Sequence, residues 1–217
     1  MSIFYLTGIL MAVVAGLILK RFLFHGDASP FLMELPKYRL PTVRNVARQL
    51  WDKGSDFLRR AFTVIFLATL VVWFLQSFTF SFQPAADVQQ SMLGALAGII
   101  APIFIPAGFG NVPAATAVLT GIMAKESVVS TLAVLGGVDA QSAEMLTAIR
   151  AVFPTTLAAV SFLLFILLYM PCVAAYAAMR REMESGRVAF ATVFSQTALA
   201  WVVATAVYQV GRLLGLG

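Results

Sequence analysis

The 217-residue chain is 60% hydrophobic and only 12% charged, with a mean hydropathy of +0.90. A soluble domain carries about twice that share of charge, so the composition excludes a water-soluble globular protein and predicts an all-α polytopic integral membrane protein. At about 20 residues per helical span, the length allows about five or six hydrophobic helices in a single transmembrane unit, 1–217. A lone cysteine excludes an internal disulfide.

The first span is predicted over residues 1–24, where an apolar run ends at Lys20. Residues 25–60 follow as a cytoplasmic loop, because nine of the fifteen Lys and Arg residues lie between Lys20 and Arg60. From Thr42 onward, apolar residues recur every three or four positions, which predicts an amphipathic helix. This helix is expected either to lie on the inner membrane surface or to lead straight into the next span. On the surface it would anchor the loop or form a coupling surface for a cytosolic partner. The basic charge indicates contact with anionic headgroups and excludes nucleic acid as a partner.

The second span, residues 61–78, leads through a polar turn to a gate region at 91–137. Leu93–Ala107 is apolar but short and is interrupted by Gly and Pro residues. This pattern predicts a re-entrant or broken helix that is packed in protein or lines a wet cavity. Pro113–Leu135 is predicted to span as one helix that begins at its proline. The chain is expected to cross the membrane five or six times, depending on whether Leu93–Ala107 spans the bilayer or re-enters it.

After the Gly136–Gly137 pair, residues 138–153 are predicted as a surface segment with a short helix over Ala140–Arg150. The C-terminal spans occupy 154–217, with one helix over Thr156–Met179 and a last helix over Val188–Leu213. The basic residues between these two helices are placed in the cytoplasm, like the earlier loop.

Lys125 and Glu126 are the only charged residues in the window 112–138. A charge at mid-bilayer costs a few kcal/mol, so each side chain should face the bundle interior or a wet cavity and have a partner. Met123 and Ser130 lie three and four residues from Glu126, on one face of the predicted helix. A carboxylate, a thioether and a hydroxyl on one face favour a transient site for a divalent cation of intermediate softness.

A second feature is the sequence from Tyr169 to Cys172, inside the predicted span Thr156–Met179. Pro171 has no amide hydrogen, so the carbonyl oxygen of Leu167 loses its helical partner at membrane depth. A thiol beside such a helix break suits a soft or borderline divalent metal, whereas Mg²⁺ would prefer oxygen ligands.

Both features also have structural interpretations. The charged pair is consistent with a polar network that holds helices together, in which Ala117 and Gly121 allow close packing. A buried cysteine commonly packs as a small hydrophobic residue, and a proline in a span commonly kinks the helix. His25 is interpreted as a solvated loop residue. The sequence contains no P-loop, HExxH, paired CxxC or GxSxG motif, so no enzyme activity and no GTP binding are expected of this chain.

Four blocks resemble, in order, the bacterial ferrous iron transport protein B family. They are Ser29–Val46, then Gly108–Asn111 with Ala124–Leu132, then Tyr169–Ala174, then Arg180–Glu182. The resemblance covers essentially the whole chain and corresponds to the C-terminal half of that family's membrane domain, including the second of its two gate motifs. The family's GTPase domain and first gate motif do not occur in this sequence, and Ala175 stands where the family often has Thr. The chain is therefore expected to be a fragment, a split subunit or a stand-alone relative.

The resemblance implies Fe²⁺ uptake across the bacterial inner membrane by a multi-pass permease. Glu126 in the gate motif and Cys172 in the Pro-Cys motif are the implied permeation residues. Met123 is expected to add soft ligation, and Ser130 and Thr131 to help replace the hydration of the ion.

The remaining expected site residues concern gating. Lys125 is expected to pair with a carboxylate or to set an electrostatic barrier, and Pro171, Gly108 and Gly110 to shape the gate. No cofactor is expected in this chain: Fe²⁺ is the transported ion, and GTP would act only through the missing domain. The expected partners are the lipid membrane and the half that carries the GTPase domain and first gate, with the oligomeric state left open.

Two other functions remain as alternatives. Gate-type helices also resemble those of nucleoside-recognition membrane proteins, so the cargo could be an organic solute such as a nucleoside. The chain could also be a non-transporting membrane scaffold, in which Lys125 and Glu126 are structural and the basic loop recruits a cytosolic protein.

Overall fold

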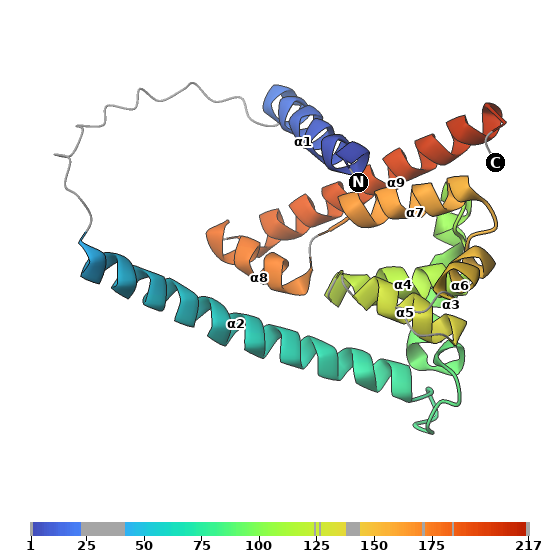
Figure 1. Ribbon diagram of the computed structural model, residues 1–217, viewed down its shortest axis with the longest axis horizontal. Coiled ribbons are helices and arrows are strands. Elements are labelled where there is room, and N and C mark those ends of the chain that lie inside the picture. The colour runs from blue at the N-terminus through green and yellow to red at the C-terminus, as the bar shows by residue number, and fades with distance from the viewer. Residues whose placement is uncertain are drawn as a thin grey trace. The chain divides into compact units, whose positions relative to one another are not determined.

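A computed structural model of the protein describes residues 2–22, 42–123, 125, 127–137, 144–170, 172–183 and 185–215 (Figure 1). In this part of the chain the regular structure is helical, apart from one isolated β-bridge between Phe78 and Pro84. The all-helical fold class is therefore confirmed. The elements are α1 (Ser2–Phe22), α2 (Val43–Ser77), the 3₁₀ helix η1 (Val88–Gln90), α3 (Met92–Ile100), the 3₁₀ helix η2 (Ala101–Ala107), α4 (Val112–Met123), α5 (Ser127–Gly136), α6 (Met145–Val152), α7 (Thr156–Leu168), α8 (Val173–Glu182) and α9 (Gly186–Leu213).

The chain divides into two compact units, Met1–Arg59 and Arg60–Gly217. The first unit holds α1 and the basic, amphipathic start of α2. α1 covers the predicted first span, because its run of Leu, Ile, Val and Ala contains no proline to interrupt the helical hydrogen bonds. His25 and the block Ser29–Pro41 lie outside the described residues.

α2 is one helix of 35 residues that joins the predicted amphipathic segment to the predicted second span. No proline interrupts it, so the helical pattern continues from the polar half into the apolar half. Of the two arrangements predicted for the amphipathic segment, the structure has the one in which the helix leads straight into the apolar run.

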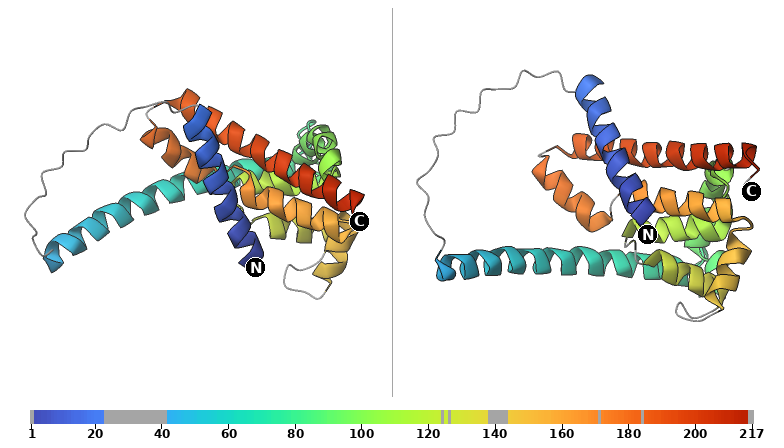
Figure 2. Two further views of the ribbon diagram at one scale, coloured as in Figure 1. Left: turned by 90° about the horizontal axis from the view of Figure 1, so that it is seen from above. Right: turned by 45° about the horizontal axis from the view of Figure 1, so that its top comes forward.

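The core of the second unit lies where α7 and α9 pack along one another beside α4 and η2 (Figure 2). Phe104, Phe109, Phe162 and Phe165 meet ring to ring there, with centroid separations between 5.1 and 5.8 Å. Small residues such as the fully buried Ala200 let α9 approach these rings closely. The core therefore holds the gate region against the C-terminal helices.

The Gly- and Pro-rich segment of the gate region forms a broken helix, as predicted. α3 ends at Ile100, and the chain continues as the 3₁₀ helix η2, which contains Pro102 and Pro106. Gly108 ends η2 with a φ of +87°, in the left-handed region that favours glycine. α4 then leaves at 105° to the helix before it.

Side chains from α7 and α9 satisfy the carbonyl oxygens of η2. Non-helical backbone at membrane depth needs such partners, because lipid provides none. One side of this segment is therefore packed against α7 and α9. The hydrogen bonds run from Trp201 Nε1 to the Ile103 oxygen (2.9 Å), from Gln209 Nε2 to the Pro106 oxygen (2.7 Å) and from Ser161 Oγ to the Ala107 oxygen (2.8 Å).

Two predicted spans are each divided into two helices in the structure. The prediction of one continuous helix over Pro113–Leu135 is wrong, whereas Thr156–Met179 is divided beside Pro171, where a helix break was predicted. Pro113–Leu135 divides into α4 and α5, and Thr156–Met179 divides into α7 and α8. At the first break a side chain replaces the helical hydrogen bond, since the Ser127 hydroxyl donates to the Thr120 carbonyl oxygen at 3.1 Å. At the second break the proline after α7 has no N–H with which to continue the helix.

The remaining helices follow the predicted order. α6 lies in the predicted surface segment and buries Met145, Ala148 and Val152, which share one helix face, while residues 138–143 lie outside the described part. α9 covers the predicted last span, and the Ser185 hydroxyl caps its start by accepting from the Val188 N–H at 3.5 Å.

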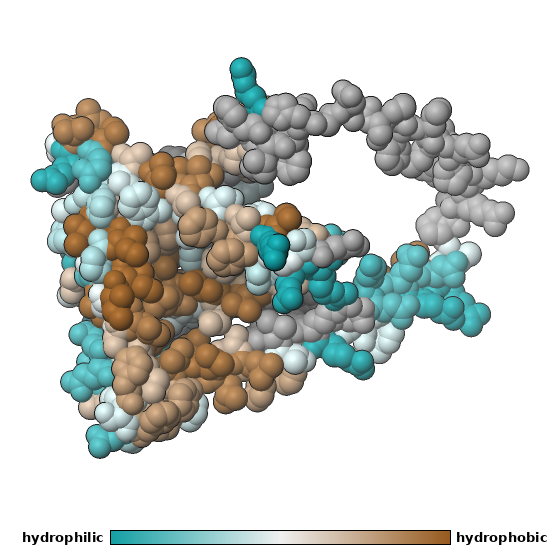
Figure 3. All heavy atoms as spheres, turned by 180° about the vertical axis from the view of Figure 1, so that it is seen from behind, coloured by the Kyte–Doolittle hydropathy of each residue, from teal (hydrophilic) through white to brown (hydrophobic). Residues whose placement is uncertain are grey.

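By length and composition, α9 is the one described helix that could cross a membrane alone. The count rises to three if two bent pairs, Met92–Ala107 with Val112–Met123 and Met145–Val152 with Thr156–Leu168, each form one span. Shorter apolar helical stretches lie at Tyr5–Leu17, Phe66–Ser77 and Ser127–Gly136. Hydrophobic side chains cover much of the face in Figure 3, as contact with lipid requires.

Candidate functional site

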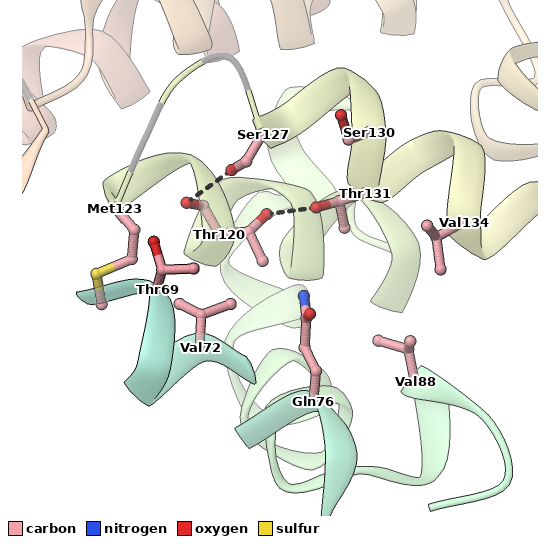
Figure 4. Close-up of a pocket in the computed structure, with 10 residues that line it drawn as sticks. All are labelled: Thr69, Val72, Gln76, Val88, Thr120, Met123, Ser127, Ser130, Thr131 and Val134. Carbon is pink, nitrogen blue, oxygen red and sulfur yellow. Dashed lines mark hydrogen bonds between the residues drawn. The ribbon is translucent and has the colours of Figure 1, made fainter. Parts of the chain in front are cut away.

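A cavity of about 230 Å³ lies between the C-terminal half of α2 and the α4–α5 pair (Figure 4). It brings together three predicted permeation residues, Met123, Ser130 and Thr131. The prediction that Met123 and Ser130 share one helix face is wrong, because Met123 ends α4 and Ser130 lies on α5. They meet because the chain folds back between these two helices. The lining residues are Thr69, Val72, Gln76, Val88, Thr120, Met123, Ser127, Ser130, Thr131 and Val134.

Hydroxyl groups join α4 to α5 along this cavity. The Thr120 and Thr131 hydroxyl oxygens are 2.9 Å apart, and both residues are buried. Thr120 Oγ1 also lies 3.1 Å from the carbonyl oxygen of Thr116, one turn earlier. The Thr131 hydroxyl thus already serves the helix pair, whereas Ser130 is exposed at the cavity.

Lys125 connects the α4–α5 break to the α7–α8 break. Its ammonium group donates to the carbonyl oxygens of Ile166 (3.1 Å), Leu167 (3.4 Å) and Tyr169 (3.4 Å). It also lies 4.9 Å from the centroid of the Tyr169 ring, within the range of a cation–π interaction. The Leu167 carbonyl, predicted to lose its helical partner, therefore bonds to a cation from another helix break. A positive charge at a helix C-terminus also interacts favourably with the negative end of the helix dipole.

Gln196 on α9 completes the polar contacts at the end of α7. Its amide donates to the carbonyl oxygens of Leu168 at 3.2 Å and Tyr169 at 3.4 Å. A lysine from the turn between α4 and α5 and a glutamine from α9 therefore satisfy the backbone where α7 stops, which is what a helix end inside a membrane requires.

Tyr169 packs between these two breaks. It is 1% exposed, and its hydroxyl donates to the Val118 carbonyl oxygen at 3.5 Å. A Cβ atom on Gly121 would lie 2.5 Å from the Tyr169 hydroxyl oxygen, so only glycine fits beneath it. Together with the fully buried Ala117, this confirms the predicted close packing at the small-residue pair.

Cys172 lies at the α7–α8 break, at the N-cap position of α8, and its thiol is free and half-buried. It is not among the residues that line the cavity with Met123. Glu126 and Pro171 lie outside the described residues. Among the residues that are described, no group of three or more His, Cys, Asp and Glu side chains could hold a metal ion.

The glycines of the gate motif shape the turn before α4. A Cβ on Gly108 would overlap the Tyr208 ring, and one on Gly110 would lie 2.6 Å from the Ile105 backbone nitrogen. Asn111 then begins α4: its Oδ1 accepts from the Ala114 N–H at 2.8 Å. Its Nδ2 donates to the α6 carbonyl of Val152 at 2.8 Å.

Sequence reasoning missed several residues here. Asn111 could have been recognised as a helix N-cap from its position before Pro113. Thr69 and Gln76 carried a weaker signal, since they are polar residues seven apart in an apolar run and so share one helix face. No sequence pattern indicated the role of Gln196.

Comparison with known proteins matches two family models in chain order. Residues 1–53 match the model described as "Ferrous iron transport protein B C terminus", and residues 58–186 match the Gate model, described as "Nucleoside recognition". No solved structure matches significantly.

Curated relatives carry the name Fe(2+) transporter FeoB. The protein from Staphylococcus aureus strain COL is 34% identical over 209 residues, which are 96% of this chain and 31% of that relative. The protein from Salmonella typhi is 31% identical over 257 residues, covering 95% of this chain and 33% of that relative. The chain thus spans about a third of the length of the curated relatives it matches. The chain therefore belongs to the ferrous iron transport protein B family, as the four sequence blocks predicted, and it carries that family's C-terminal domain followed by a Gate domain.

Proposed function

We propose that this chain forms the C-terminal half of the membrane domain of a ferrous iron permease in the bacterial inner membrane. The observation that carries the proposal is the cavity beside the α4–α5 break, where Met123 and Ser130 meet. The names of relatives that match 96% of the chain support Fe²⁺ as the cargo. The chain would cross the membrane several times, and α9 has the length of a full span.

In this proposal the ion passes the two helix breaks in turn. The Met123 thioether and the Ser130 hydroxyl offer one soft and one hard ligand atom at the cavity. Cys172 offers a thiol at the second break, and Glu126 supplies the negative charge that the family resemblance implies. Lys125 holds the second break in shape through its three carbonyl contacts.

The energy source and the other half of the pathway would come from a GTPase domain and a first gate. These belong to a further part of the same polypeptide or to a partner subunit. GTP would therefore act on this chain only through that part.

The test is Fe²⁺ uptake into proteoliposomes that hold this chain assembled with its other half, under anaerobic conditions. Glu126→Gln and Cys172→Ser should each lower uptake, and Cys172→Ser should also reduce the preference for Fe²⁺ over Mg²⁺, because it removes the soft ligand. Ser130→Ala should lower uptake, while Ser195→Ala, on the exposed face of α9, should not. Unchanged uptake and selectivity in the first two variants would disprove the site.

The Gate match favours one other cargo, a nucleoside-like solute, because that model is described as nucleoside recognition. Hydroxyl and amide groups around a neutral cavity could bind such a molecule. Competition of uptake by Fe²⁺ and by adenosine in the same vesicles separates the two cargoes.

A further inference from the structure

We infer that Thr69 and Gln76 of α2 form the second wall of the cargo site and hold a partly hydrated divalent cation against α4 and α5. The inference deepens the proposed function and rests on it for the identity of the cargo. It assigns a binding role to α2, which neither the family motifs nor the charged residues indicate.

The geometry places both residues at the cavity. Thr69, Val72 and Gln76 are spaced three and four residues apart, so they form one stripe on α2, and all three line the cavity. Figure 4 shows Gln76 pointing from α2 toward the Thr120–Thr131 pair on the opposite wall.

Gln76 and Thr69 also have free hydrogen-bonding capacity. Neither side chain has a hydrogen-bond partner among the described residues, and Gln76 is half-buried one residue before the end of α2. A half-buried polar group that has no partner in the protein is free to bond to water or to a ligand. The Gln76 amide is therefore suited to a ligand rather than to the fold.

The lining chemistry fits a cation in transit. None of the ten lining residues is charged, and their polar atoms are the hydroxyls, the Gln76 amide and the Met123 thioether. Neutral oxygens replace water weakly, which lets an ion enter and leave without being trapped. The single soft atom favours Fe²⁺ over Mg²⁺.

The volume supports the same conclusion. A water molecule occupies about 30 Å³ in the liquid, so an ion with six waters needs roughly 180 to 200 Å³. The cavity has about 230 Å³. Pockets for drug-sized organic ligands start at about 300 Å³. The cavity is therefore large enough to admit a hydrated or partly hydrated ion.

The first experiment tests whether the α2 wall faces a cargo cavity. In a Cys172→Ala background, the Gln76→Cys variant is placed in phosphatidylcholine vesicles and treated with a charged, water-soluble thiosulfonate. Val71→Cys is the matched control, because Val71 lies on the same helix, is 50% exposed and does not line the cavity. We expect labelling of Gln76→Cys to slow at least tenfold in anaerobic Fe²⁺ and little in Mg²⁺, with no protection of Val71→Cys. Failure to label Gln76→Cys, or protection by adenosine instead of Fe²⁺, would overturn the inference.

The second experiment measures Fe²⁺ uptake by the assembled permease. Gln76→Leu and Thr69→Val should each raise the KM about tenfold, because an oxygen ligand is lost. Gln76→Glu should lower both the KM and the maximal rate, because a carboxylate holds the ion more tightly. Gln83→Leu, in the exposed turn after α2, is the control and should match the wild type.

The outcomes distinguish the role of α2 from the proposed function of the chain. A role of Gln76 in packing alone predicts the same loss in Gln76→Leu and Gln76→Glu, and that result would overturn the inference. Normal uptake by all α2 variants would overturn it while leaving the proposed function intact. Absence of Fe²⁺ uptake by the wild-type assembly would instead contradict the proposed function, and labelling without Fe²⁺ protection would then overturn the cation site as well.

Discussion

Replacing Lys125 by Met should loosen the α7–α8 break and expose the thiol of Cys172. The ammonium group bonds to three carbonyl oxygens at the end of α7, and Met removes all three bonds while keeping an apolar side chain of similar length. After this change Gln196 still donates to the carbonyl oxygen of Tyr169. The carbonyl oxygens of Ile166 and Leu167 lose their bonds to the ammonium group.

The expected magnitude follows from the geometry. A hydrogen bond to a charged group contributes roughly 1.5–3 kcal/mol. Two of the three distances are 3.4 Å and Lys125 is half-buried, so we count the three contacts as one strong bond, about 2 kcal/mol. Since about 1.4 kcal/mol changes an equilibrium constant tenfold, opening of the break should increase roughly 30-fold.

Cys172 reports this opening directly, because it is the only thiol in the chain. The measurement is the rate at which an uncharged maleimide modifies the protein in lipid vesicles, which should rise up to about 30-fold in Lys125→Met. Lys125→Arg should stay close to the wild type, because it keeps the charge and the donors. Lys53→Met, at an exposed position of α2, controls for the loss of one positive charge. A Lys125→Met rate within twofold of the wild type would refute the role of Lys125 at this break.

Three further predictions concern the thermal unfolding midpoint in one detergent. Gly108→Ala should destabilise the protein by about 1–3 kcal/mol, because φ is +87° and the new methyl overlaps the Tyr208 ring; a Tyr208→Ala background should relieve only the overlap. Gly121→Ala should cost about 1–3 kcal/mol, because its methyl meets the hydroxyl of Tyr169, whereas Gly98→Ala, with nothing within 4 Å, should be neutral or stabilising. Equal midpoints for these two alanine variants would contradict the packing argument. Thr131→Val should cost about 1 kcal/mol by breaking the hydroxyl pair with α4, and an unchanged midpoint would show that this pair is dispensable.

The sequence predicted the features that depend on local chemistry. Gly and Pro residues indicated the broken helix before the gate motif, and the structure has it at η2 and Gly108. The 3.6-residue period indicated the amphipathic helix at the start of α2. Pro171 indicated a carbonyl without a helical partner at Leu167, and that oxygen bonds outside its own helix. Gly and Pro act on the backbone whatever surrounds them, and the amphipathic period is a property of the local sequence alone.

The features that depend on distant segments were missed. The break between α4 and α5 contains neither Gly nor Pro, and the apolar sequence on both sides resembles a continuous span. Side-chain bonds across the break replace the helical ones, and Lys125 reaches partners more than 40 residues away. Thr69 and Gln76 lie in the predicted second span, and only the fold shows which stripe of α2 meets α4 and α5.

The side chains that bond to η2 raise the free energy needed to move this part of the gate region. Shifting η2 would break three hydrogen bonds to α7 and α9 at once, a cost of about 3 kcal/mol before any loss of packing. Across the joint between α4 and α5, the Thr120 and Thr131 hydroxyls form a pair and the Ser127 hydroxyl donates to the Thr120 carbonyl oxygen. A movement of the gate region that leaves η2 in place on α7 and α9 therefore avoids this cost. The 3₁₀ helix η2 is thus a fixed part of the gate region, against which other segments would have to move.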